Sequence, residues 1–176
     1  MAEKRYDLVV VGAGPAGYGA AVRAAESGAA VALVERDGLG GACLNRGCIP
    51  TKTLIHGASV LSAVASAADW GVLCGRPAMD MAALHAKKNQ VVDGLRQGVA
   101  RLLATSRVDV LHGVGRVPAP GRVTVAGPDG GQTLETNSIL LCLGARPSLP
   151  PIPGLRLPGV VTSDALLAST EIPESL

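Results

Sequence analysis

The sequence predicts an α/β fold of three layers, with a central parallel sheet and an added β-hairpin or meander. Two apolar runs, at residues 7–11 and 30–34, have the length and valine content of strands that are buried on both faces. Residues 15–27 between them have helical periodicity, so the three segments predict a right-handed crossover unit with parallel strands. The turn sequence Pro128-Asp129-Gly130-Gly131 lies between two short alternating segments and predicts the hairpin.

The remaining elements follow from the same periodicities. The first helix is expected to end at Gly28, which can adopt the left-handed conformation, and a second helix is expected over residues 53–68. Asp80 can cap a longer helix that reaches about residue 104. Its expected buried stripe consists of Leu84, Val91, Leu95, Val99 and Leu102. Further strands are expected at residues 108–111, 122–125, 132–135 and 139–143, the last of which returns to the parallel sheet.

The chain is long enough for one domain with a sizeable core, since it has 176 residues, of which 48% are hydrophobic. We expect residues 1–145 to form this domain. Residues 146–176 are rich in proline and predict an irregular connector towards a further domain. The 23 glycines indicate tight backbone packing around a buried ligand.

Composition argues against nucleic-acid and membrane partners. The net charge of +2 comes from scattered basic residues, and the aromatic residues are Tyr6, Tyr18 and Trp70, too few for a base-stacking surface. No apolar run approaches the length of a membrane span, and residues 138–145 are better explained as a buried strand. The N-terminus has neither a secretory nor a transit pattern, so we expect a cytoplasmic protein in which cysteines normally stay reduced.

A glycine fingerprint follows the first predicted strand. Gly12 would make a tight turn, Gly14 would let a pyrophosphate approach the backbone, and Gly17 would let helix and strand pack closely. The helix that opens at Pro15 offers N–H groups and its dipole to phosphate. Glu35, at the end of the next strand, is placed to accept hydrogen bonds from an adenosine ribose. The fingerprint therefore predicts a Rossmann-like FAD- or NAD(P)-binding domain. These residues do not distinguish the two cofactors. The alternative interpretation is a strand–helix turn that binds no ligand.

Cys43 and Cys48 form a pair at a spacing of five residues. This spacing does not place two side chains on one face of a regular helix, so a disulfide needs a locally distorted turn, which Gly47 and Pro50 permit. A strained small loop favours a reducible, working disulfide, and a nearby helix start favours the thiolate. There are two alternatives to a redox pair. One is a metal site, which would need further ligands, and the other is two unconnected buried cysteines.

Residues 40–52, Gly-Gly-Ala-Cys-Leu-Asn-Arg-Gly-Cys-Ile-Pro-Thr-Lys, resemble the active-site signature of the class I pyridine nucleotide-disulfide oxidoreductases. Ile49, followed by Pro50-Thr51-Lys52, is similar to the dihydrolipoamide dehydrogenase branch, whereas glutathione and mercuric reductases usually have valine at that position. The resemblance extends from Tyr6 to Leu176. It implies FAD as the cofactor, so that residues 1–145 would be the FAD-binding domain.

The resemblance also implies roles for single residues. Cys48 would be the charge-transfer thiolate beside the flavin, Cys43 the interchange thiol that attacks the substrate disulfide, and Lys52 a cation near the flavin N5. The glycine loop would hold the pyrophosphate, Gly115 would meet the adenine, and residues 143–145 would cross the cofactor again. The residues expected at the cofactor are Gly12, Gly14, Pro15, Gly17, Glu35, Arg36, Gly40, Gly41, Ala42, Cys43, Lys52, Gly115, Leu143, Gly144 and Ala145.

Two positions depart from the family pattern. Ala42 stands where threonine is usual, and Cys142-Leu143-Gly144 stands where Ala-Thr-Gly is common. Neither change removes a backbone donor, so we expect altered contacts with FAD but the same cofactor. Cys142 and Cys74 are expected to be buried bystanders, and no metal site is expected.

The resemblance describes a longer enzyme. That enzyme would oxidise lipoyl-bearing or small disulfide substrates through FAD, with NAD as acceptor, as a homodimer and as part of a 2-oxo acid dehydrogenase complex. The chain contains one fingerprint and no histidine in the family's His-Pro context, so we expect the NAD site and the catalytic His-Glu pair to lie outside a truncated sequence. The sequence is compatible with three functions. The first is a FAD-dependent dihydrolipoyl dehydrogenase, the second a flavin-binding module without turnover, and the third a relative of glutathione or mercuric reductase.

Overall fold

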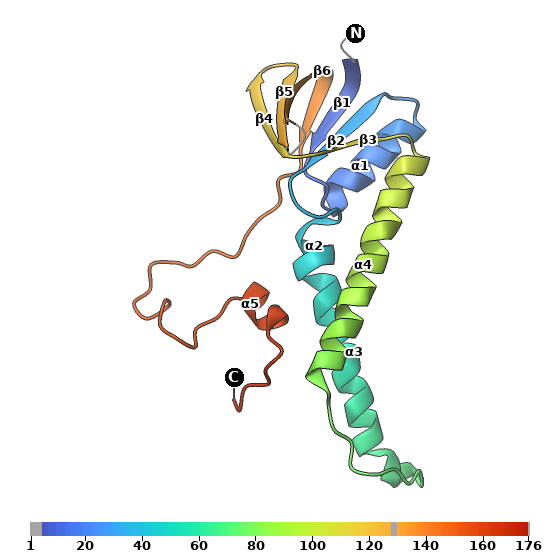
Figure 1. Ribbon diagram of the computed structural model, residues 1–176, viewed down its shortest axis with the longest axis vertical. Helices are drawn as coiled ribbons and strands as arrows, with labels where there is room; N and C mark the ends of the chain where they lie inside the picture. Colours follow the sequence, from blue (N-terminus) through green and yellow to red (C-terminus); the bar gives the residue numbers. More distant parts are fainter. Residues whose placement is uncertain (1–4, 128–129, 176) are drawn as a thin grey trace. The chain divides into compact units, whose positions relative to one another are not determined.

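A computed structural model describes residues 5–127 and 130–175 (Figure 1). The chain divides into two compact units, one of Met1–Asn45 with Gly94–Ala145 and one of Arg46–Asp93 with Arg146–Leu176. The elements are β1 (Arg5–Val11), α1 (Pro15–Glu26), β2 (Val31–Glu35), α2 (Gly41–Arg46), α3 (Cys48–Ala65), the 3-10 helix η1 (Ala67–Trp70), α4 (Met81–Thr105), β3 (Asp109–His112), β4 (Val114–Ala119), β5 (Arg122–Gly127), β6 (Gly130–Leu141) and α5 (Ser163–Ala168). The predicted α/β class is confirmed.

The first unit contains a six-stranded sheet with the order β3-β2-β1-β6-β5-β4. Strands β3, β2, β1 and β6 are parallel, and β5 and β4 continue the sheet as an antiparallel meander. Strand β6 belongs to both parts, because it pairs parallel with β1 and antiparallel with β5. The predicted hairpin is confirmed by pairs such as Val123 with Leu134. Pro128 and Asp129 of its predicted turn lie outside the described residues.

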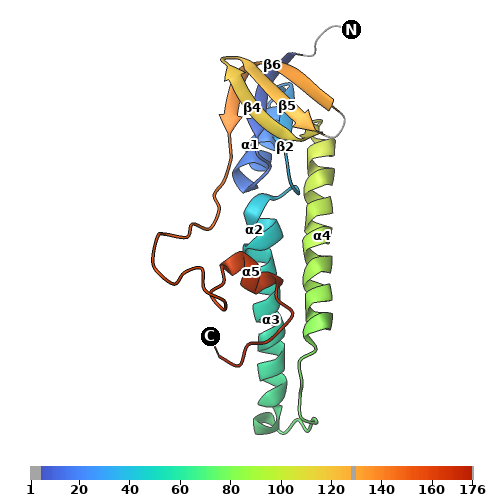
Figure 2. The same ribbon diagram turned by 60° about the vertical axis from the view of Figure 1, so that its left-hand side comes forward.

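The meander folds over one face of the parallel strands, where β4 contacts β2 and β5 contacts β3 (Figure 2). The core between them consists of Tyr6, Val9, Val11, Ala32, Val34, Val123, Val125 and Leu134. Helix α1 contacts β1 and β2. Val10 and Leu33 alternate with the core valines and are fully buried, which explains why these strands have near-continuous apolar sequences.

Several boundaries differ from the predictions. Helix α3 begins at Cys48, not residue 53, because Pro50 lies in its first turn, where a missing N–H costs no helical hydrogen bond. Residues 132–135 and 139–141 belong to one strand, β6, whose end is not buried as expected: Leu141 is 55% exposed. The segment expected to be an irregular connector contains the short helix α5, capped by the Thr162 hydroxyl. Helix α2 and strand β4 were not predicted.

Helix α4 is capped as predicted, since the Ala83 N–H donates to the Asp80 carboxylate at 3.0 Å. Its predicted buried stripe is wrong at two positions, because Leu95 and Leu102 are 44% and 43% exposed. The buried positions of this helix are His85, Lys88, Val92, Val99 and Leu103. Lys88 can be buried because its ammonium donates to the Leu167 carbonyl oxygen at 3.0 Å.

None of the helices in the described part of the chain has both the length and the apolar character needed to cross a membrane.

Candidate functional site

The carboxyl ends of the parallel strands β1, β2 and β6 converge on Gly12. The Gly12 N–H donates to the Val34 carbonyl oxygen at 2.8 Å, and the Cys142 N–H, just past β6, donates to the Val11 carbonyl oxygen at 2.8 Å. Gly12 has φ +104°, and a Cβ there would lie 2.2 Å from the Cys142 carbonyl oxygen. The tight turn therefore requires glycine. Open parallel sheets bind ligands at this edge.

Gly17 and Gly14 are glycines for different reasons. A Cβ on Gly17 would lie 1.8 Å from the Gly12 carbonyl oxygen, so close packing of α1 on the strand end requires glycine. Gly14, the N-cap of α1, has φ −69° and ψ 179°, which any residue adopts, and its Cβ would meet only Gly41 Cα at 3.9 Å. Among the residues that the structure describes, no side chain caps the helix, which opens with the exposed Pro15. Open space before unpaired helical N–H groups fits a pyrophosphate.

The Glu35 side chain joins the end of β2 to the glycine loop. Its Oε2 accepts a hydrogen bond from the Ala13 N–H at 2.7 Å, and its Oε1 accepts one from the Asp37 N–H at 2.8 Å. Glu35 is 9% exposed. Each carboxylate oxygen can accept a further hydrogen bond, so the predicted contact with a ribose is compatible with this arrangement. The adjacent Arg36 is exposed and pairs with Asp37 at 3.5 Å.

The loop that leads from β2 into α2 lies against the glycine loop. The Gly40 N–H donates to the Ala13 carbonyl oxygen at 2.9 Å. Gly40 and Gly41 have φ +97° and +62°, and a Cβ on Gly41 would lie 2.6 Å from Gly14 Cα. Ala42 follows as an exposed residue. The structure thus brings the two predicted glycine segments together at one place.

Asn45 and Arg96 are functional candidates that the sequence did not reveal. Asn45 Nδ2 donates to the carbonyl oxygens of Gly38, Leu39 and Gly41, and its Oδ1 accepts hydrogen bonds from the Arg96 guanidinium. The available signal was an asparagine between two cysteines, a residue type that readily bonds to nearby backbone.

The two cysteines occupy helices that follow one another along the chain. Cys43 is half-buried in α2, and the exposed Cys48 opens α3. Between them Gly47 leaves the helical conformation, with φ −131° and ψ −102°, so the helical path is interrupted at the glycine expected to permit distortion. Lys52 lies one helical turn after Cys48, so the two exposed side chains share a face of α3.

The last predicted site residues lie on β4 and after β6. A Cβ on Gly115 would lie 2.8 Å from a Val11 methyl group, so packing of β4 on β1 already requires glycine there. Leu143, Gly144 and Ala145 are exposed after the end of β6, beside the Gly12 turn. Leu143 is 67% exposed and presents an apolar side chain at this edge.

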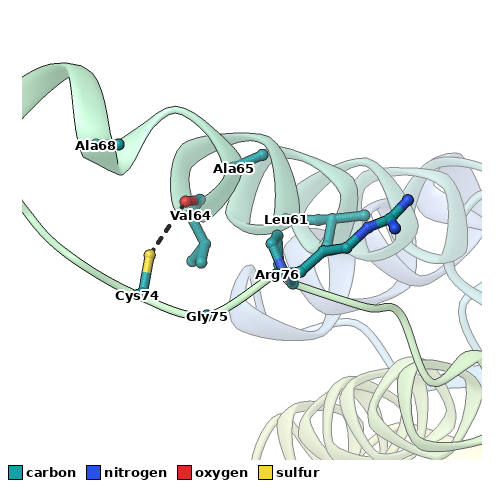
Figure 3. Close-up of a pocket in the computed structure, with 8 residues that line it drawn as sticks. Leu61, Val64, Ala65, Ala68, Cys74, Gly75 and Arg76 are labelled. Atoms are coloured by element: carbon teal, nitrogen blue, oxygen red, sulfur yellow. Dashed lines mark hydrogen bonds between the residues drawn. The ribbon is translucent and has the colours of Figure 1, made fainter.

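The other two cysteines are not buried as expected. Cys142 is half-buried, and Cys74 is exposed and donates to the Val64 carbonyl oxygen at 3.4 Å (Figure 3). A shallow hollow beside Cys74 is lined mainly by α3 residues such as Leu61 and Val64 and by residues 74–77, and it contains none of the predicted site residues. In the described ranges, no three side chains of the metal-binding types gather.

Comparison with known proteins gives a family match along the chain. The family model described as pyridine nucleotide-disulphide oxidoreductase matches residues 6–176. Two dihydrolipoyl dehydrogenases, from Acholeplasma laidlawii and Chlamydia pneumoniae, are 40% and 41% identical over 98% and 97% of this chain. The chain spans 52% and 35% of their respective lengths.

Solved structures give a consistent result. The HOCl-induced flavoprotein disulfide reductase RclA from Escherichia coli, in its Cu(II) complex, has a TM-score of 0.79 and 34% identity and is matched over 97% of this chain and 36% of its own. A second RclA structure has a TM-score of 0.77 at 34% identity, over 96% of this chain and 35% of its own.

Proposed function

Because the chain belongs to the pyridine nucleotide-disulphide oxidoreductase family, we propose that it is the FAD-binding part of a flavoprotein whose redox pair is Cys43 and Cys48. The observation that supports this proposal most strongly is the open space at the Cβ position of Gly14. Its backbone conformation is ordinary and the protein leaves its Cβ position open, so room for a bound pyrophosphate is the reason for glycine.

The residues of the first unit would hold the cofactor. Residues 12–17 and the start of α1 bind the pyrophosphate through backbone N–H groups, and Glu35 accepts from the adenosine ribose. Gly115 lines the adenine, and residues 143–145 cross the cofactor beside the Gly12 turn. Residues 1–145 then form the FAD-binding domain, and residues 146–176 form the connector towards a further domain.

The cysteine pair exchanges with the substrate by thiol–disulfide chemistry. A thiolate of a substrate dithiol attacks Cys43 Sγ in the Cys43–Cys48 disulfide, which breaks the S–S bond and leaves Cys48 as a thiolate. The second substrate thiolate then attacks the substrate sulfur of the mixed disulfide and releases Cys43. Two electrons have passed from substrate to protein. FAD, when bound, supplies a two-electron acceptor for the reduced pair, and Lys52 supplies positive charge on the Cys48 face of α3.

For the longer protein, we propose dihydrolipoyl groups as substrate and NAD as the final acceptor, on the basis of the relatives named dihydrolipoyl dehydrogenase. A homodimer that works with a 2-oxo acid dehydrogenase complex in the reducing cytoplasm fits this chemistry. The likeness to RclA supports a second candidate, a flavoprotein disulfide reductase with a different disulfide substrate. Turnover of dihydrolipoamide by the longer protein distinguishes the two.

A titration with FAD tests the cofactor site. We expect the purified chain to quench FAD fluorescence saturably, and Gly14→Ala to weaken the affinity at least about tenfold, because a methyl group occupies the phosphate position. Gly19→Ala is the matched control, since Gly19 is exposed in the same helix and nothing lies within 4 Å of its Cβ position. Unchanged affinity in Gly14→Ala, or a wild-type chain that binds no FAD, would contradict the proposal.

A further inference from the structure

We infer that Asn45 is a positioning residue, which fixes the residue 38–41 loop and thereby the helix that carries Cys43. This inference rests on the proposed function, because it gives that function's cofactor loop and interchange thiol a common support. All the contacts that carry it lie within the first compact unit.

The Asn45 amide binds the segment that leads from β2 into the first residue of α2. Its Nδ2 lies 3.1 Å from the Gly38 and Leu39 carbonyl oxygens and 2.9 Å from the Gly41 carbonyl oxygen. Gly38 and Leu39 lie outside the described helices and strands, and Leu39 is buried, whereas Gly41 is the first residue of α2. Buried carbonyls without a donor are costly, so one side chain supplies what secondary structure does not.

Arg96 fixes the orientation of that amide. The Arg96 Nε and Nη2 donate to Asn45 Oδ1 at 3.0 and 2.7 Å. Because a guanidinium can only donate, the oxygen must face Arg96 and the amino group must face the loop. The pair is also close to the loop backbone: a Cβ on Gly38 would lie 3.1 Å from Arg96 Nε and 3.2 Å from Asn45 Oδ1.

The loop needs such a tie because its own residues cannot hold it. Gly40 and Gly41 both have positive φ, and glycine has more conformational freedom to lose than any other residue. Gly41 also touches the backbone of Gly14. Cys43 lies in the chain between this contact and Asn45, so the same hydrogen bonds hold both the proposed cofactor loop and the thiol in position. Loss of the Asn45 amide should therefore disturb both together.

Asn45→Asp is the decisive variant, because it is isosteric and can still pair with Arg96 but cannot donate to the three carbonyls. Iodoacetamide labelling of the reduced, FAD-free protein reads the position of Cys43. Trypsin cleaves after Arg46, so Cys43 and Cys48 are measured on separate peptides. We expect Asn45→Asp to raise the labelling rate of Cys43 about tenfold, with Cys142 of the same unit unchanged.

Three further variants complete the experiment. Asn45→Ala should have the same effect as Asn45→Asp, Arg96→Met a smaller one, and Arg96→Lys, which keeps a donor, should restore most of the wild-type rate. Asn89→Ala, exposed on α4, is the control. In FAD titrations Asn45→Asp should weaken affinity by about the same factor as it raises the Cys43 rate.

Equal increases at Cys43 and Cys142 would mean general unfolding and would overturn the inference, as would unchanged labelling of Cys43. If the wild-type chain takes up no FAD, the proposed function fails, whereas the labelling ratio, measured without FAD, still decides the role of Asn45.

Discussion

The Glu35 carboxylate accepts a hydrogen bond from the Ala13 N–H at 2.7 Å, which connects the end of the second strand to the glycine loop after the first. A residue proposed to contact the cofactor therefore also holds the loop proposed to bind it. We expect cofactor affinity and protein stability to be coupled at this position.

Glu35→Gln should lower both the affinity for FAD and the free energy of unfolding. A glutamine can accept from only one side, so an amide N–H₂ would face either the Ala13 or the Asp37 N–H. We expect a loss of about 1–3 kcal/mol in unfolding free energy and a weaker affinity for FAD. Urea unfolding and fluorescence titration measure the two effects. Glu26→Gln, on the exposed surface of α1, is the control and should change neither by much.

Gly17→Ala should destabilise the protein, whereas Gly19→Ala should not. The added methyl group at position 17 would collide with the Gly12 carbonyl oxygen, so helix and strand must separate. We expect a cost above about 3 kcal/mol, or no folded protein. Gly19→Ala places a better helix former at an exposed site and should stabilise by about 0.5–1 kcal/mol. Equal melting temperatures of the two variants would show that the strand–helix contact is looser than described.

Tyr6→Phe should remove a pH dependence of stability in alkaline solution. Burial, and then the hydrogen bond to Asp109 at 2.8 Å and its negative charge, raise the pKa of Tyr6 above its ordinary value of 10.0. The unfolded chain loses this proton first, so the contribution is present below about pH 10 and declines above it. Urea unfolding at a series of pH values should show a steeper alkaline loss in wild type than in Tyr6→Phe. Tyr18→Phe should retain the wild-type slope.

His85 should make the second unit less stable in mild acid. Burial, and then the neighbouring Lys88 ammonium, lower the pKa of His85 below 6.5 and outweigh a hydrogen bond with the Ser169 backbone, which raises it. The unfolded chain takes up a proton first as pH falls, so this stability is present above about pH 6.5 and is lost below it. His85→Leu should flatten the unfolding free energy between about pH 7 and 5. The exposed His56→Gln should leave the slope unchanged.

The glycine fingerprint and the strands of the crossover unit could be predicted because their signals are local. The backbone at the strand end requires Gly12 and Gly17, and the apolar runs at residues 7–11 and 30–34 predict strands buried on both faces. The same holds for Asp80, whose cap needs only three residues of chain. Such features depend little on distant parts of the molecule.

The missed features depend on contacts between distant segments. The predicted buried stripe of α4 omits Lys88 because lysine is rarely buried, and the hydrogen bond to the Leu167 carbonyl, 79 residues away, makes its burial possible. Likewise Asn45 acquires its role from Arg96, 51 residues away. Strand β4 was missed because its polar and glycine residues gain their strand partner from β5.

Anaerobic reduction with dithionite tests the central claim, that Cys43 and Cys48 work as a redox pair with FAD. The FAD-loaded wild-type chain should take up two electrons for the disulfide in addition to the two for the flavin. Cys48→Ser should take up only those of the flavin, and Cys74→Ser, altered at an exposed cysteine outside the pair, should behave as wild type. A wild-type chain that takes up no more electrons per bound flavin than Cys48→Ser would contradict the claim.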